Sequence, residues 1–269
     1  MNTQSTSRSS IIRPAGRLLP GLCLVIAMVA SSLMPFAPPA ARAELQTDTG
    51  VWGVVMARGN FAYFSPDLKS PDLKRWLWWM EGQVRYRDCC NSEFTLYQTL
   101  IRPGIGYALT DQSTVWVGYA HVWNELPDNT DIQEDRIWEQ YMWSGKTPLG
   151  AFTSRSRFEQ RWQANGSDTG SRFRQFFKFS WPIAFLPATD FVVWDEVFVN
   201  LYDTDWGPKL QSHQGLDQNR GFVGFGYRIS PEIRTEIGYI NQYIQTHTIA
   251  NDRMNNIISM TLFFDFYKK

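Results

Sequence analysis

The sequence contains few cysteines and histidines. Its 269 residues include three of each, and the cysteines beyond residue 43 are Cys89 and Cys90. No Cys-x-x-Cys pair and no mixed cluster of His and Cys has the spacing of zinc ligands, so we expect neither a metal nor another cofactor. In an oxidising compartment, Cys89 and Cys90 could form a disulfide with each other or with a partner, or remain thiols without a function.

The sequence also lacks net charge and, beyond its first 43 residues, a long apolar run. Its 26 basic residues balance 26 acidic residues, which argues against a nucleic-acid-binding protein. A transmembrane helix needs about 18 or more consecutive apolar residues, and residues 44–269 contain no such run. We therefore expect no membrane-spanning helix in this part of the chain.

The first 43 residues have the features of a secretory signal peptide. Arg8, Arg13 and Arg17 precede an apolar stretch at 18–34, and Ala41-Arg42-Ala43 follows it. A basic region, a short apolar region and an Ala-x-Ala site in this order predict export and cleavage. We therefore predict a signal peptide at 1–43 and a single mature domain at 44–269.

Much of the mature sequence alternates charged with apolar residues. In the run 152–162, Arg155, Arg157, Glu159 and Arg161 occupy every second position, and the runs 171–181 and 190–201 are similar. A period of two predicts β-strands with one charged and one apolar face. Dense charges of both signs, together with 15% aromatic residues including 12 Trp, are typical of a transmembrane barrel with a polar interior and a lipid-facing outer wall.

We predict an all-β, antiparallel transmembrane barrel of about twelve strands. The first two strands would form a hairpin that turns at Gly59-Asn60, and ten strands is the alternative if 51–65 is irregular. Short connections after 109, 144, 182 and 229 predict periplasmic turns, and longer ones predict external loops, with both termini in the periplasm. The expected strands are 51–57, 60–65, 73–86, 95–108, 114–124, 134–144, 152–162, 171–181, 190–201, 220–229, 233–243 and 255–266.

Two of the predicted hairpins share glycine positions. Gly104-Ile-Gly106-Tyr107 and Gly118-Tyr119 have counterparts in Gly224-Phe-Gly226-Tyr227 and Gly238-Tyr239. Glycines within strands let a barrel wall bend and leave room for large neighbours inside. Two hairpins that meet the same steric need explain the similarity better than an internal duplication does.

The charged faces supply the candidate functional residues. The basic side chains could form a ladder that selects anions, or they could pair with acids and fill a narrow lumen. Unpaired charges inside a closed barrel are costly, and about twelve strands enclose a small bore, so the mixed signs favour a filled lumen. The candidate network consists of Glu81, Arg85, Arg102, Glu134, Arg136, Arg155, Arg157, Glu159, Arg161, Arg172, Arg174, Lys178, Glu196 and Arg220.

A lipid-modifying hydrolase of the lipase or deacylase type is an alternative function. Such a barrel enzyme needs His and Ser two positions apart on one strand face, so that the imidazole can activate the hydroxyl. None of His121, His213 and His247 has Ser at the second following position, although a pair from separate strands stays open. A soluble periplasmic β-sandwich, with its aromatic faces packed between two sheets, is a third interpretation.

Several short motifs, taken in order, resemble those of a family of uncharacterised bacterial outer-membrane barrels, domain of unknown function 2490. The resemblance covers about 48–267 and implies a barrel fold, an outer-membrane location and no established activity or catalytic residues. The matching motifs are Glu134-x-Arg136-x-Trp138-x-Gln140, Arg157-x-Glu159-x-Arg161, Arg172-x-Arg174, Glu196-x-Phe198-x-Asn200, Asp217-Gln-Asn-Arg220 and the two Gly-x-Gly-Tyr hairpins.

The sequence therefore predicts an outer-membrane barrel of a Gram-negative bacterium. It would be either a narrow channel for small solutes or a structural barrel whose lumen is filled by Arg and Glu. The expected partners are outer-membrane lipid and lipopolysaccharide, the barrel-assembly machinery and a small anionic solute, and no nucleic acid. The last predicted strand carries Phe264 and Phe266, and Tyr267 follows them, which is the kind of aromatic end that the assembly machinery reads, although Lys268-Lys269 comes after it.

Overall fold

The computed structural model describes residues 46–64, 72–88, 94–125, 131–164, 166–206, 211–246 and 252–267. The predicted signal peptide at 1–43 and the cysteine pair at 89–90 lie outside these ranges. Among the described residues, no helix is long and apolar enough to cross a membrane.

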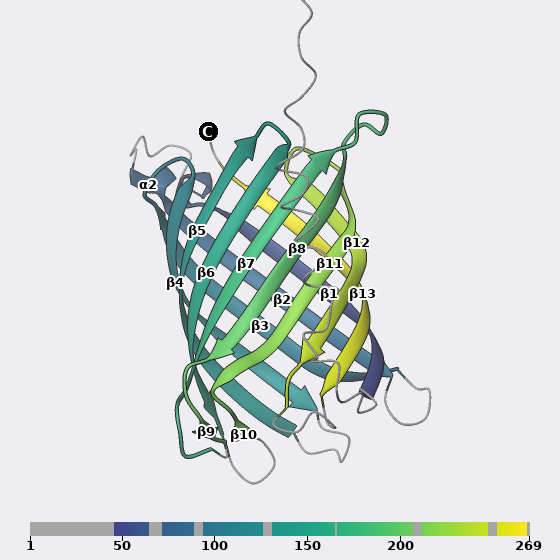
Figure 1. Cartoon of the computed structure of the whole chain (residues 1–269). Coiled ribbons are helices and arrows are strands. Elements are labelled where there is room, and N and C mark those ends of the chain that lie inside the picture. The colour runs from purple at the N-terminus through teal and green to yellow at the C-terminus, as the bar shows by residue number, and fades with distance from the viewer. Residues whose placement is uncertain are drawn as a thin grey trace, which may run out of the picture.

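The described chain folds into one closed β-barrel of tilted strands (Figure 1). This confirms the predicted all-β barrel, with eleven strands in place of about twelve. Neighbours around the barrel follow the order β1, β13, β12, β11, β8, β7, β6, β5, β4, β3, β2. The strands are β1 (Gln46–Asn60), β2 (Trp76–Asp88), β3 (Phe94–Ala108), β4 (Ser113–Glu125), β5 (Asp131–Thr147), β6 (Gly150–Gln163), β7 (Gly170–Pro182), β8 (Thr189–Asn200), β11 (Gly215–Arg228), β12 (Ile233–Ile244) and β13 (Arg253–Phe266).

The barrel closes through one parallel pair, in contrast to the antiparallel barrel that the sequence predicted. β1 pairs with β13 in parallel, in a register that runs from Gln46 opposite Arg253 to Gly59 opposite Phe266. The opposite edge of β1 pairs antiparallel with β2, and every other neighbouring pair in the barrel is antiparallel. An odd strand number is compatible with closure because this single parallel seam joins the first strand to the last.

The predicted hairpin at Gly59-Asn60 was wrong. The segment 46–60 is one strand, and a short 3₁₀ turn at Phe61–Tyr63 and a single helical turn, α2 (Asp72–Arg75), precede β2. A Cβ on Gly59 would lie 2.2 Å from the backbone oxygen of Phe266. Gly59 therefore permits the close approach of β13, which explains a glycine there without a turn.

The two ends of the barrel differ in their connections. Short turns join β3 to β4, β5 to β6, β7 to β8 and β11 to β12, and the C-terminus lies at this short-turn end together with α2 (Figure 1). The connections at the opposite, long-loop end span five to fourteen residues, and the link from β8 to β11 there forms a small hairpin of β9 (Thr204–Asp205) and β10 (Gln211–Ser212). The fifteen-residue link from β1 to β2, which contains α2, is the exception at the short-turn end. Because β1 runs parallel to β13, the barrel begins at the long-loop end, and not beside the C-terminus as predicted.

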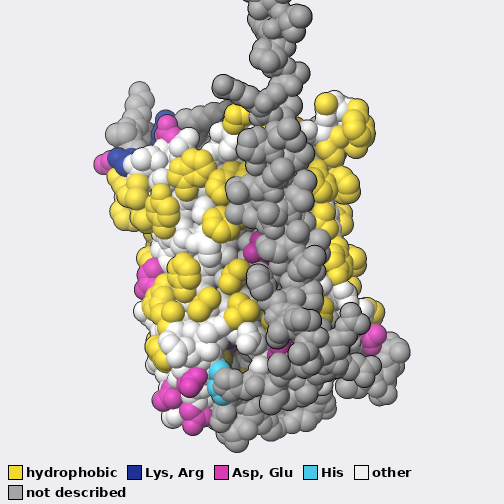
Figure 2. Space-filling view, viewed as in Figure 1, with side chains coloured by type: hydrophobic (Ala, Val, Ile, Leu, Met, Phe, Trp, Pro, Cys, Tyr) yellow, Lys and Arg dark blue, Asp and Glu magenta, His cyan; other side chains and the backbone are white. Residues whose placement is uncertain are grey.

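The outer wall of the barrel is largely apolar. Val51, Val55, Ile105, Val117 and Ile258 project from it and are each 44% or more exposed. Figure 2 shows hydrophobic side chains over much of the visible wall, and a group of acidic side chains near the end with the long connections. The alternation that the sequence predicted therefore places apolar side chains outside.

A continuous row of aromatic rings crosses five neighbouring strands on the outer wall near the short-turn end. Successive ring centroids lie 4.6–6.0 Å apart. The rings of Phe266, Trp78, Phe64 and Tyr63 form a second group at the same end. The row consists of Trp143, Phe152, Phe179, Trp181, Phe191 and Phe225.

The shared glycines of the two hairpins make room for interior aromatic rings. Gly104 lies opposite Gly118 on the β3–β4 ladder, and a Cβ on either would lie within 2.6 Å of Trp138. Gly224 likewise lies opposite Gly238, and a Cβ on either would lie 2.6 Å from the ring of Phe222. Each hairpin therefore accommodates one large ring against a bare stretch of backbone.

Candidate functional site: the charged barrel interior

The barrel interior holds the charged side chains that the sequence singled out. Twelve of the fourteen candidates are buried to 8% exposure or less, while Arg155 and Lys178 are half-buried. They come from β2, β3, β5, β6, β7, β8 and β11, so the charged faces of seven strands converge on one interior. Most of the contacts form between strands that are neighbours in the barrel, because charges at every second position meet those of the adjacent strand.

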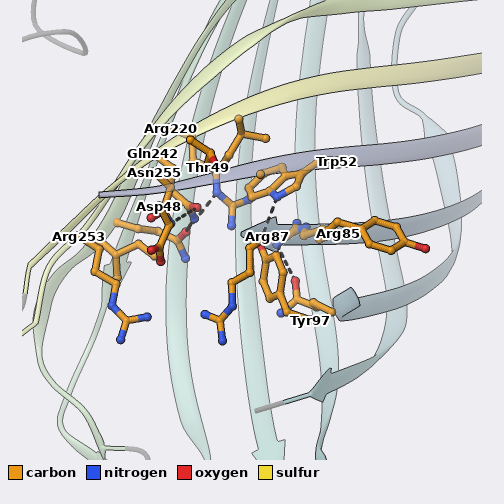
Figure 3. A pocket seen from close by; sticks show the side chains of 16 residues that line it. Asp48, Thr49, Trp52, Arg85, Arg87, Tyr97, Arg220, Gln242, Arg253 and Asn255 are labelled. Carbon is orange, nitrogen blue, oxygen red and sulfur yellow. Dashed lines mark hydrogen bonds between the residues drawn. The ribbon is translucent and has the colours of Figure 1, made fainter. Parts of the chain in front are cut away.

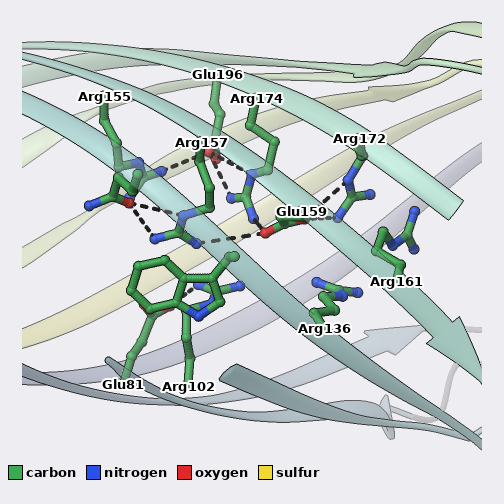
Figure 4. Close-up of polar contacts among 12 residues, drawn as sticks. Glu81, Arg102, Arg136, Arg155, Arg157, Glu159, Arg161, Arg172, Arg174 and Glu196 are labelled. Carbon is green, nitrogen blue, oxygen red and sulfur yellow. Dashed lines mark hydrogen bonds and ion pairs between the residues drawn. The ribbon is translucent and has the colours of Figure 1, made fainter. Parts of the chain in front are cut away.

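Glu159 lies at the centre of this network. One of its carboxylate oxygens accepts a hydrogen bond from Arg174 at 2.6 Å, and the other accepts one from Arg172 at 2.7 Å. Arg157, on the same strand, is 3.7 Å away. Glu159 lies directly opposite Arg172 on the β6–β7 ladder, so the strand register itself produces the contact (Figure 4).

Three further glutamates each hold one or two arginines. Glu196 accepts hydrogen bonds from Arg155 and Arg174, both at 2.7 Å. Glu134 accepts them from Arg136 at 2.7 Å and from Arg161 at 2.5 Å. The pair of Glu81 and Arg102, at 2.9 Å, joins residues directly opposite each other on β2 and β3.

Side chains fill the barrel at mid-height. Trp138 and Glu159 are fully buried, and Arg157 is 1% exposed. The Arg157 guanidinium lies 4.6 Å from the centre of the Trp138 ring and donates two hydrogen bonds to Gln140. Trp79 packs edge-on against Trp138 and Trp116. The middle of the described interior is therefore a packed layer of rings and guanidinium groups.

A separate charged cluster occupies the short-turn end of the interior. Glu236 accepts hydrogen bonds from Lys178 and from Arg234, and Arg58 pairs with Asp265 at 2.6 Å. Lys178 therefore does not extend the central arginine group, as a continuous basic ladder would require. The sequence interpretation overlooked Arg234 and Glu236, although they stand two positions apart on one strand, which is the signal used for the other strands.

The interior contains two adjoining cavities toward the long-loop end, of about 340 Å³ and about 170 Å³. Arg85, Tyr97, Gln98, Gln218 and Arg220 line both cavities. Figure 3 shows the smaller cavity, with Arg85, Tyr97 and Arg220 among its lining residues. Together we call these two cavities the arginine hollow. Eight arginines and two glutamates line its larger part: Arg85, Arg87, Arg102, Arg136, Arg161, Arg172, Arg174, Arg220, Glu125 and Glu134.

Two residues outside the candidate set help to shape the arginine hollow. The ring of Trp52 lies 4.1 Å from the Arg85 guanidinium and 4.9 Å from that of Arg220. Trp206, from the β9–β10 connection, packs against Arg161 at 4.2 Å. Neither tryptophan belongs to a charged alternating run, so the sequence offered no signal for its role.

Within the described part of the interior, basic charge exceeds acidic charge. Seven arginines of the central network share the carboxylates of Glu81, Glu134, Glu159, Glu196 and Asp217. Asp217, which pairs with Arg172 at 2.9 Å, was overlooked as a site residue. Arg85 and Arg220 lie beside this network and contact amide oxygens of glutamines.

The described histidines lie away from the charged interior. His121 Nδ1 is 2.6 Å from Asp135 Oδ1 and 3.3 Å from the Tyr119 hydroxyl, on the outer wall. His213 Nδ1 is 3.7 Å from Asp203 in the connection between β8 and β11. A hydrolytic triad needs a nucleophilic hydroxyl within hydrogen-bond reach of the imidazole, and the hydroxyl beside His121 is a phenol. His247 lies outside the described residues.

Comparison with known proteins places the chain in a family. The model of a family described as "Protein of unknown function (DUF2490)" matches residues 49–255. The chain belongs to this family. The DUF2490 match extends from β1 into β13, so it includes all fourteen candidate residues. An uncharacterized protein of Methylorubrum extorquens (strain AM1) is 33% identical over 259 residues, which cover 94% of this chain and 99% of that protein. No solved structure matches.

Proposed function

We propose that this DUF2490 protein is a bacterial outer-membrane barrel with a closed interior. In this proposal, residues 1–43 are a cleaved signal peptide and residues 44–269 form the membrane domain. The observation that carries the proposal is the distribution of side chains, with buried charges inside the barrel and exposed apolar residues over its outer wall. A wall of this kind would be unfavourable in water, and it suits lipid.

The aromatic row near the short-turn end supports the same proposal. Trp and Tyr concentrate where a membrane meets water, because their rings are apolar and their polar atoms can reach the interface. Transmembrane barrels carry such rings as girdles around the outer wall. The row from Trp143 to Phe225 would form part of the periplasmic girdle, with the short turns in the periplasm and the long connections outside.

The packed layer at mid-height favours a closed barrel over a channel. Trp138, Arg157 and Glu159 occupy the position that a conducting path would have to cross. The paired charges on either side are satisfied by one another, as expected for a filled lumen. We therefore propose that solutes do not pass through the centre of the barrel. The protein would act at the outer surface of the cell, by binding a partner there or by a structural role.

Outer-membrane lipid, lipopolysaccharide and the barrel-assembly machinery are the proposed partners. The apolar outer wall would contact lipid, and the long connections would lie among lipopolysaccharide head groups. Phe264 and Phe266 on β13 are stacked, with ring centroids 6.4 Å apart. They would present an aromatic end of the chain to the assembly machinery.

Cell fractionation and electrophoresis test the location. We expect the protein in the outer-membrane fraction, with a folded band that shifts in migration after boiling. Recovery in the soluble periplasmic fraction would contradict the proposal.

Planar-bilayer recording tests the closed interior, for which we expect no steady conductance from the wild-type protein. Stable conductance steps would restore the channel interpretation.

A further inference from the structure

The arginine hollow has the features of a binding site. It lies inside the barrel wall toward the long-loop end, and its larger part has a volume of about 340 Å³. Cavities of about 300–1,000 Å³ are typical of small-molecule sites. The inference drawn from this hollow goes beyond the proposed location of the protein and does not depend on it, because the hollow belongs to the folded barrel.

Arg85 and Arg220 line the arginine hollow, and neither forms an ion pair with a carboxylate of the described residues. Both are 8% exposed. Glu196 lies opposite Arg220 on the β8–β11 ladder, but its carboxylate accepts hydrogen bonds from Arg155 and Arg174. Arg85 donates to Gln98 at 2.5 Å and to Gln83 at 2.6 Å, and its buried Nε has no hydrogen-bond partner. Arg220 donates through its Nε to Gln218 at 3.1 Å. The other guanidinium nitrogens of Arg220 have no ion pair within the described chain, and they face the hollow.

These two arginines are held in place by neutral groups. Trp52 contacts both guanidinium groups, and it donates a hydrogen bond to the Tyr97 hydroxyl at 3.1 Å. A relay of amides fixes the position of Arg220, since Asn255 donates to Gln242 at 3.1 Å and Gln242 donates to Gln218 at 2.6 Å. Their orientation is therefore set before any ligand arrives, which favours tight binding.

The neighbouring carboxylates are already occupied. Glu134 holds Arg136 and Arg161, and the remaining carboxylates of the central network hold their own arginines. Half-buried Asp48 and exposed Glu125 also line the hollow, near its long-loop end, together with Arg87 and Arg253. Buried positive charges without a counterion are unfavourable, and an anion that enters the hollow would relieve this.

We propose that the arginine hollow binds a small soluble anion that carries phosphate groups. A guanidinium donates two parallel hydrogen bonds to phosphate or carboxylate oxygens. A phosphate group presents three such oxygens in different directions, and it can therefore accept from both Arg85 and Arg220, which contact the same Trp52 ring. A lipid phosphate offers the same chemistry, but the hollow lies on the inner side of the barrel wall, away from the lipid-facing surface.

Calorimetric titration of the folded protein with inorganic pyrophosphate tests the proposal. The protein is refolded from inclusion bodies into detergent micelles, so that bacterial lipid is absent, and folding of each variant is checked by circular dichroism and tryptophan fluorescence against the wild type. We expect saturable binding by the wild type that weakens as salt is added. We expect about a tenfold or greater loss of affinity in Arg85→Gln and in Arg220→Gln, since each removes charged hydrogen bonds. Affinity equal to that of the wild type in both variants would overturn the proposal.

Arg228→Gln is the matched control, because Arg228 is exposed at the short-turn end and its loss changes the net charge equally. We expect its affinity to stay within about twofold of the wild type. An equal loss in all three variants would indicate general charge attraction and contradict a built site.

Citrate tests the phosphate assignment, which tighter binding of citrate than of pyrophosphate would overturn. A short-chain phosphatidic acid tests the source, and binding of this lipid in place of pyrophosphate would contradict a soluble ligand.

Discussion

Arg174 donates through one terminal guanidinium nitrogen to Glu159 at 2.6 Å and through the other to Glu196 at 2.7 Å, so that it joins two buried carboxylates from different strands. Glu159 is in turn shared with Arg172 and Arg157. If a charge with several buried partners of opposite sign is removed, those partners repel one another without a counterion between them. We therefore expect the free energy of unfolding of the barrel to depend strongly on Glu159.

Glu159→Gln should destabilise the folded barrel by about 3–5 kcal/mol, because it leaves buried arginines without their counterion. Urea unfolding in detergent or lipid, followed by tryptophan fluorescence, measures the change. Glu232→Gln is the control, since Glu232 lies in an exposed turn, and we expect a change within about 0.5 kcal/mol. Equal midpoints for the two variants would contradict a structural role of the central network.

Removing the packed layer should open the barrel. Trp138→Ala combined with Arg157→Ala deletes the two largest fully buried side chains of the packed layer, which are at most 1% exposed in the native protein. We expect this double variant to conduct ions in planar bilayers where the wild type does not. Because basic residues outnumber carboxylates in the remaining network, the conductance should prefer anions. A double variant that folds and stays silent would show that other side chains close the interior.

The glycines of the β3–β4 hairpin provide a steric test. Gly118→Ala would place a Cβ 2.3 Å from Trp138 and 2.4 Å from the backbone oxygen of Pro103, so we expect a loss of about 1–3 kcal/mol from overpacking. Gly82→Ala is the matched control, because nothing lies within 4 Å of its added Cβ. The unfolding midpoints of the two variants give the comparison. Similar midpoints would mean that the Trp138 ring can adopt another position without a loss of stability.

The parallel seam places the two ends of the barrel on opposite sides of the membrane in the proposed outer-membrane orientation. An epitope tag directly before Gln46 should be accessible to antibody on intact cells, and a tag after residue 267 should not, because β1 and β13 run in the same direction. Permeabilised cells supply the control for both tags. If both tags are hidden on intact cells, the termini share one side, as an even-stranded antiparallel barrel would have them.

The sequence predicted which side of each strand faces inward, because a period of two needs only local information. The positions of Arg157 and Glu159 inside, and of Val117 and Ile258 outside, follow from that parity alone. Membership of DUF2490 is confirmed too, from short motifs in order. The location in the outer membrane and the role of the candidate residues stay predictions.

The sequence did not reveal how the barrel closes, because closure depends on strands at opposite ends of the chain. Gly59-Asn60 has the composition of a turn, and only the approach of Phe266 shows why a glycine stands there. The arginine hollow was missed for a related reason. Trp52 has no charged neighbours in sequence, and it becomes part of the hollow only when β1 is brought beside β2 and β13.

The β1–β13 seam also determines when the barrel can close during folding. β1 is synthesised first among the barrel strands, yet one of its edges has to wait for β13, which is made last. Until then β1 exposes an unpaired row of backbone donors and acceptors, which is a template for pairing with other chains. Closure at long sequence separation is slow. In the proposed exported protein, this order of strands would therefore create an interval in which β1 needs protection from pairing with other chains.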